Sequence, residues 1–215
     1  MNKMTKSVIA AAILAATSSA AMAGASANIG MVSDYHFRGI DQGTGATASA
    51  GLDYDTKGFY VGTWVADVQI GMEYDLYAGY AGEASGVSYD VGYYTYRYTN
   101  DAFDDNYGEI ALSVGYGPIS ASYAKGSWDG YGTKQDYTFA SITGEYKGMY
   151  ATYGTHGEDF DGSYIELGYG TEIGGFDTGV ALISADDTLQ PTLNNSGDTV
   201  GDMSVVFSVS KGFDL

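Results

Sequence analysis

The stretch Gly71–Glu83, GMEYDLYAGYAGE, alternates between apolar and polar side chains along its length. One set of alternate positions carries apolar or aromatic side chains: Met72, Tyr74, Leu76, Ala78 and Tyr80. The other set carries acidic, small or polar-tipped side chains: Glu73, Asp75, Tyr77, Gly79 and Glu83. Successive side chains of a β-strand point to opposite faces. The stretch therefore predicts a strand with one apolar face and one face that carries carboxylates.

The same alternation recurs after residue 27, in segments of about 10 residues, the length that a tilted strand needs to cross a membrane. We identify twelve segments, with ten or fourteen as alternatives: 28–38, 47–54, 59–66, 71–83, 87–98, 107–117, 119–125, 136–146, 149–155, 163–171, 176–185 and 203–213. The connections after even-numbered segments are short, and those after odd-numbered segments are mostly longer and acidic, which is typical of bacterial barrels. We therefore predict an all-β fold, an antiparallel transmembrane β-barrel of twelve strands.

The third segment, 59–66, is apolar on both faces, so its inward and outward phases stay open. Elsewhere the phase is assigned from the acidic residues. On strand 87–98, an inward Asp90 places Tyr94 and Tyr96 inside as well.

The first 23 residues predict a secretory signal peptide, cleaved from a barrel of residues 24–215. Lys3 and Lys6 precede the short apolar run Val8–Ala16, and Ala21–Ala23 forms an A-x-A cleavage site. Ala25–Ala27 is an alternative site, which would start the mature chain at Asn28. Together with the barrel, this predicts the outer membrane of a Gram-negative bacterium. The apolar alternation that ends at Phe213 resembles the signal read by the barrel assembly machinery, which we expect as a partner during biogenesis.

Composition excludes several classes of protein. The formal net charge of −18 opposes binding to nucleic acid. The absence of cysteine excludes disulfide and thiol chemistry. An apolar fraction of 45% with 21 tyrosines is too high for a disordered chain. We predict no cofactor, and as partners outer-membrane lipid, lipopolysaccharide and a small solute.

The predicted interior is strongly acidic and lined with tyrosine. The inward residues that we assign to the lumen and to selectivity are Asp34, His36, Arg38, Asp53, Glu73, Asp75, Asp90, Tyr94, Tyr96, Glu109, Glu145 and Glu166. Rings of carboxylates favour cations, and tyrosine faces beside them suit ammonium groups. The sequence predicts a porin for passive diffusion of small cationic or zwitterionic solutes. The alternative for the acids is structural: they solvate the interior or pair with Arg38.

Two other functions remain open. One is a closed structural or adhesive barrel whose acidic outer loops, such as 156–162 and 186–202, bind ligands. The other is a lipid-modifying enzyme that uses His36 beside Asp34, or His156. Neither histidine has a nucleophile motif beside it, so we predict that the protein is not an enzyme. The acidic loops lack the spacing of an EF-hand, so we assign no metal-binding residues, and loose binding of Ca²⁺ or other divalent ions by these loops stays open.

Three sequence blocks resemble the TorF-type porin family of proteobacteria, formerly a conserved hypothetical family. They are Asn28–Ile40 (NIGMVSDYHFRGI), Gly58–Trp64 (GFYVGTW) and Glu73–Tyr80 (EYDLYAGY). The resemblance implies an outer-membrane barrel with a link to trimethylamine N-oxide respiration, and it transfers no functional residues. Two features depart from the family pattern: His36 stands where a basic residue, often arginine, is expected, and the last two residues extend past the usual aromatic end.

Overall fold

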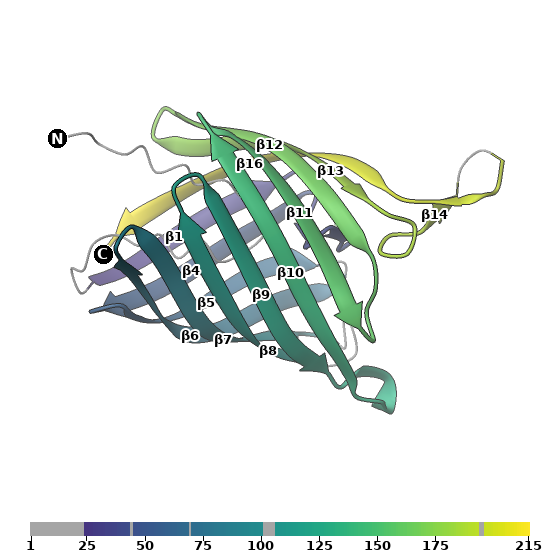
Figure 1. Cartoon of the computed structure of the whole chain (residues 1–215), viewed down its shortest axis with the longest axis horizontal. Coiled ribbons are helices and arrows are strands. Elements are labelled where there is room, and N and C mark those ends of the chain that lie inside the picture. Colours follow the sequence, from purple (N-terminus) through teal and green to yellow (C-terminus); the bar gives the residue numbers. More distant parts are fainter. Residues whose placement is uncertain (1–23, 44, 69, 101–105, 194–195) are drawn as a thin grey trace.

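The computed structural model describes residues 24–43, 45–68, 70–100, 106–193 and 196–215 (Figure 1). The predicted signal peptide, residues 1–23, lies outside the described residues. Figure 1 shows strands running obliquely around a barrel, with β14 projecting from the end opposite to the C-terminus. Within the described segments, no helix is long and apolar enough to cross a membrane.

Twelve antiparallel strands close the barrel, which confirms the predicted fold. They are β1 (Gly24–Val32), β4 (Thr47–Thr56), β5 (Phe59–Val68), β6 (Gly71–Ala84), β7 (Val87–Tyr98), β8 (Tyr107–Tyr116), β9 (Ile119–Trp128), β10 (Gln135–Tyr146), β11 (Met149–Glu158), β12 (Ser163–Ile173), β13 (Phe176–Ala185) and β16 (Met203–Asp214). The shorter elements are β2 (His36–Phe37), β3 (Ile40–Asp41), η1 (Gly130–Gly132), β14 (Thr192–Leu193) and β15 (Thr199–Val200). Strand β1 pairs with both β4 and β16, and this pairing closes the wall.

The two ends of the barrel differ in their connections. At one end, five consecutive strand pairs are joined by two-residue turns: 57–58, 85–86, 117–118, 147–148 and 174–175. In four of these turns both residues have a positive φ, as in Lys57 (53°) followed by Gly58 (89°). This is the type I′ conformation, whose twist matches that of the flanking strands. The long connections 33–46 and 186–202 lie at the other end.

The outward face of the wall is apolar. On β6, Met72 and Leu76 are exposed, whereas Glu73 and Asp75 between them are only 2% and 1% exposed. The stretch Gly71–Glu83 therefore has the predicted orientation, with its apolar face outward and its acidic face inward. The phase of β5, which the sequence left open, is now settled: Phe59 and Val61 face outward.

Several predicted segment boundaries differ from the strand ends, and two of the differences move candidate site residues. The first strand ends at Val32 rather than at residue 38, and the chain then forms the small hairpin β2–β3. Arg38 and Gly39 make its two-residue turn, with φ values of 51° and 83°. A twelve-strand barrel is wider than the eight-strand barrels that wall side chains fill, so this hairpin supplies interior packing. Strand β11 also extends to Glu158, which places His156 on a strand rather than in a loop.

Inward tyrosines pack over glycines on the neighbouring strand. The cross-strand pairs are Gly62–Tyr77, Gly79–Tyr60, Gly126–Tyr137, Gly154–Tyr164 and Gly168–Tyr150. A Cβ built on any of these glycines would overlap the ring of its partner. The pairing accounts for five of the 32 glycines, because each of these five rings lies where its partner has no side chain.

Replacing Gly62 with alanine should destabilise the barrel by about 1–3 kcal/mol, because the new methyl group overlaps Tyr77 and the carboxylate of Asp53. Urea titration of the folded protein in lipid vesicles measures the loss. The matched control is Gly144→Ala on β10, where an added Cβ meets no atom within 4 Å. Equal stability of the two variants would contradict the packing role of this pair.

Candidate functional site

An ion pair connects the β2–β3 hairpin to the barrel wall. Arg38 Nη1 donates to Glu109 Oε2 at 2.8 Å, and Nη2 donates to Oε1 at 2.6 Å. The hydroxyls of Tyr96 and Tyr137 each donate to Glu109 at 2.9 Å. The Glu109 side chain has no exposed surface and the Arg38 side chain has 12%. Both oxygens of the buried Glu109 carboxylate are thus hydrogen-bonded and paired with a guanidinium, the condition under which a buried charge is tolerated.

Aromatic rings surround the hairpin tip. The Arg38 guanidinium lies 4.4 Å from the ring centre of Phe139 and 4.8 Å from that of Phe37. The Arg38 carbonyl oxygen lies 3.1 Å from His156 Nε2. Gly39 packs directly against the ring of Tyr164, where a side chain would not fit. The tip therefore packs inside the barrel against residues of β8, β10, β11 and β12. We call these residues the socket: Glu109, Tyr137, Phe139, His156 and Tyr164.

Most of the inward carboxylates accept hydrogen bonds from tyrosine hydroxyls. Besides the two bonds to Glu109, the donor–acceptor pairs are Tyr77–Asp53 (2.5 Å), Tyr60–Asp90 (3.2 Å), Tyr94–Asp90 (3.4 Å), Tyr35–Glu73 (3.3 Å) and Tyr150–Glu166. An ionised carboxylate is a pure acceptor and a tyrosine hydroxyl supplies the donor. The tyrosine hydroxyls therefore supply donors to most of the acidic side chains inside the barrel.

Asp75 is different from the other inward acids. It is 1% exposed, and neither of its carboxylate oxygens has a hydrogen-bond partner in the described part of the chain. Its register partners are Trp64 on β5 and Tyr96 on β7, so aromatic residues flank it on both sides. A buried charge without a partner is costly. The acidic group that interacts most strongly with Asp75 is Glu73, two residues away on the same face of β6.

The predicted lumen residues differ in how far their side chains are buried. Asp53 and Asp90 are half-buried, whereas Glu73, Asp75, Glu109 and Glu166 are buried. Tyr94 and Tyr96 are buried and inward, as predicted. Glu145 shares the inward phase with its partner Tyr150 but is exposed beside a two-residue turn. The structure brings Arg38, Tyr96 and Glu109 together, and it leaves Glu145 apart from them.

Asp34 and His36 form the pair that the sequence suggested. His36 Nε2 lies 3.0 Å from Asp34 Oδ2. The nitrogen partners of the two histidines are this carboxylate and the carbonyl oxygen of Arg38, rather than a serine hydroxyl. Within the described part of the chain, neither histidine ring contacts a nucleophilic hydroxyl of the kind found in hydrolytic triads.

Asp186 organises the start of the longest outer connection. Its Oδ2 accepts from the amide and hydroxyl of Ser163 at 2.7 and 2.8 Å, and its Oδ1 accepts from the amide of Leu189 at 2.9 Å. Partial burial acts to raise the pKa of Asp186, but these hydrogen bonds outweigh it and hold the pKa below its usual range. This acid of the predicted ligand-binding loop is therefore committed to loop structure.

Sequence reasoning missed several residues of the socket around Arg38. Tyr137, Phe139 and Tyr164 line it, yet none was assigned a role. The available signal was the cross-strand pairing of inward tyrosine with glycine, as in Gly126–Tyr137 and Gly154–Tyr164. That signal requires the strand register, which alternation alone does not give.

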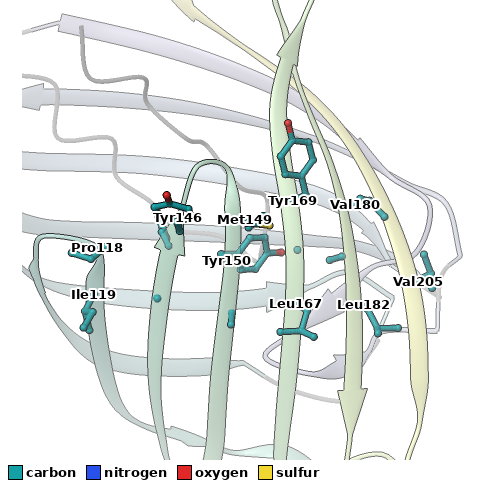
Figure 2. A pocket seen from close by; sticks show the side chains of 15 residues that line it. Pro118, Ile119, Tyr146, Met149, Tyr150, Leu167, Tyr169, Val180, Leu182 and Val205 are labelled. Atoms are coloured by element: carbon teal, nitrogen blue, oxygen red, sulfur yellow. The ribbon is translucent and has the colours of Figure 1, made fainter. Parts of the chain in front are cut away.

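A concavity of about 760 Å³ lies near the short turns, over strands β9 to β13 and β16 (Figure 2). Many of the side chains that line it point away from the barrel axis and are exposed: Ile119, Tyr146, Met149, Leu167, Tyr169, Leu182 and Val205. The concavity is therefore largely a feature of the apolar outer wall, and it contains none of the residues around Arg38.

Comparison with solved structures finds other barrels at low sequence identity. One, described as "Unveiling the Mechanism Behind the in-meso Crystallization of Membrane Proteins", has a TM-score of 0.59 at 12% identity, over 89% of this chain and 84% of that chain. OccAB3 of Acinetobacter baumannii has a TM-score of 0.42 at 14% identity, over 87% and 60%. The outer membrane protein OpdK of Pseudomonas aeruginosa has a TM-score of 0.39 at 13% identity, over 80% and 58%. The first of these likenesses supports the fold alone.

No curated protein matches the sequence. A family model described as "Bacterial protein of unknown function (Gcw_chp)" matches residues 15–213, which is most of the chain. The chain therefore belongs to the Gcw_chp family of bacterial proteins of unknown function.

Proposed function

We propose that the protein is an outer-membrane channel for the passive diffusion of small solutes. The observation that carries the proposal is the closed barrel with an apolar outer wall and a charged interior. A barrel has no free strand edges, so it can place its backbone in lipid with every hydrogen bond made. The resemblance to TorF-type porins supports the same role. Lipopolysaccharide and the barrel assembly machinery are the expected partners.

The charge of the interior favours cations and zwitterions. At least six carboxylates face inward on the described strands: Asp53, Glu73, Asp75, Asp90, Glu109 and Glu166. Arg38 balances Glu109 alone. The carboxylates within reach of a solute are those of the half-buried Asp53 and Asp90, whose charge attracts cations and repels anions. Small ammonium compounds, or zwitterions such as trimethylamine N-oxide, fit this charge and the tyrosine faces beside it.

Asp53→Asn and Asp90→Asn should both move the reversal potential toward zero in planar bilayers that separate unequal KCl concentrations. Both carboxylates are half-buried, and asparagine can still accept the bond from tyrosine while it removes the charge. The control is Asp187→Asn, which removes an equal charge from an exposed outer position. Unchanged selectivity in both lumen variants would reject the cation preference.

The seated hairpin favours a second candidate, a barrel that is closed at rest. The buried Arg38–Glu109 pair and the packing of Gly39 against Tyr164 fill the interior at this level. A structural or adhesive barrel would be supported if neither the folded wild type nor a folded variant without the Arg38–Glu109 contact gives conductance steps. Steps in the wild-type protein would support the channel.

A further inference from the structure

We propose that Asp34, His36 and Asp41 form a binding site for a divalent transition-metal ion such as Zn²⁺. One ligand atom from each residue lies within 4.8 Å of the other two. The residues come from the base of the β2–β3 hairpin: His36 and Asp41 are opposite each other in its register, and Asp34 precedes it by two residues. The three side chains thus come from one stretch of eight residues, which the hairpin folds so that they meet.

The state of His36 separates this cluster from an ordinary group of surface acids. His36 is 8% exposed and its Nε2 points at Asp34, while its Nδ1 is buried and has no hydrogen-bond partner in the described structure. A buried imidazole nitrogen without a partner loses hydration without compensation. The ring is therefore only partly satisfied by the protein.

The two carboxylates have oxygen atoms to spare. Asp41 Oδ1 accepts from the amide of Gly43 at 2.6 Å, which fixes the orientation of the carboxylate. The Asp34 side chain is 27% exposed, so an ion can reach the cluster from solvent. Neither acid is paired to lysine or arginine among the described ion pairs. Both carboxylates therefore have oxygen atoms that can bind a cation.

The ligand chemistry selects the class of ion. One imidazole nitrogen and two carboxylate oxygens suit Zn²⁺ and its neighbours in the first transition series, with water in the remaining positions. Ca²⁺ and Mg²⁺ prefer oxygen ligands alone. The site is independent of the conduction that we propose above, because binding can be measured on a barrel that conducts nothing.

The test is calorimetric titration of the untagged mature barrel, refolded in detergent after treatment with a chelator, with ZnCl₂ and separately with CaCl₂. We expect saturable binding of one Zn²⁺ and weaker binding of Ca²⁺. His36→Gln and Asp41→Asn should each weaken Zn²⁺ binding at least about tenfold, the scale of loss when metal-site residues are replaced. Circular dichroism and the temperature of unfolding establish that each variant is folded.

Two controls separate the site from general acidity. Asp161→Asn removes an acid that, like Asp41, caps a loop amide, and it should leave the affinity unchanged. Asp187→Asn removes an exposed acid of the outer connection and should also leave it unchanged. The proposal is overturned by an absence of saturable Zn²⁺ binding, by a loss smaller than tenfold in either folded site variant, or by Ca²⁺ binding as tight as that of Zn²⁺. If His36→Gln and Asp41→Asn do not fold, Asp34→Asn is titrated in their place. The same tenfold loss of Zn²⁺ affinity is then expected, and a smaller loss overturns the proposal.

Discussion

Replacing Arg38 with methionine should destabilise the folded barrel by about 3–5 kcal/mol, the cost of leaving a buried charge without its partner. Glu109 would keep two tyrosine donors but lose both guanidinium bonds, in a position with no exposed surface. The change is measured as a shift in the urea midpoint for unfolding from lipid vesicles. The double variant Arg38→Met/Glu109→Met should recover much of the loss, because it removes the unpaired charge.

A surface pair provides the matched control. Lys125 Nζ on β9 lies 2.6 Å from Glu158 Oε1 on β11. The two side chains are 59% and 36% exposed. Lys125→Met should change stability little, because water solvates the remaining carboxylate. A loss in Lys125→Met as large as that in Arg38→Met would show that the buried pair has no special role.

The same substitution tests the position of the hairpin in the conducting path. If the Arg38–Glu109 pair holds the hairpin in the lumen, folded Arg38→Met should show larger or more frequent conductance steps than the wild type. Identical steps in the two proteins would place the solute path elsewhere. This readout is independent of stability, because only folded protein inserts as a closed barrel.

Replacing Leu112 with arginine should cost about 2–4 kcal/mol, the penalty for a cation on the lipid face near the middle of a membrane-spanning barrel. Leu112 lies at the centre of β8, faces outward and is 50% exposed. In a barrel surrounded by water, an exposed arginine at this site would be tolerated. The free energy of unfolding from lipid vesicles therefore tests the membrane setting directly.

Leu193 is the control for this prediction. It belongs to β14 in the outer connection and is 74% exposed. Leu193→Arg should leave stability nearly unchanged, because this strand projects from the barrel (Figure 1). Equal tolerance at both leucines would argue against lipid around the wall.

The barrel wall could be predicted because its physical rule is local. Alternating side chains identify a strand whose faces meet different solvents, and the segments 87–98 and 176–185 match their strands at both ends. Two-residue turns such as Lys147–Gly148 mark boundaries in the same local way. Where both faces are apolar, as in Phe59–Val68, alternation carries no phase, and only the closed sheet determines it.

The interior could not be predicted to the same extent. Strands of two residues, such as β2 and β3, are too short to show a period, so the hairpin looked like a continuation of the first strand. Arg38 was therefore predicted to face inward from the first strand. It does lie inside the barrel, but in the turn of the β2–β3 hairpin. Whether an inward acid is buried, like Glu109, or half-buried, like Asp53, depends on contacts between residues far apart in sequence.

Strands β1 and β16 come from opposite ends of the barrel sequence, yet they pair from Ser26–Asp214 to Val32–Ser208. Every other neighbouring pair in the wall is consecutive along the chain. Closing a long loop costs entropy, and contacts distant in sequence slow folding. We expect the hairpins with tight turns to form early and this seam to join last. A chain halted before that step would present two unpaired sheet edges, which are templates for aggregation.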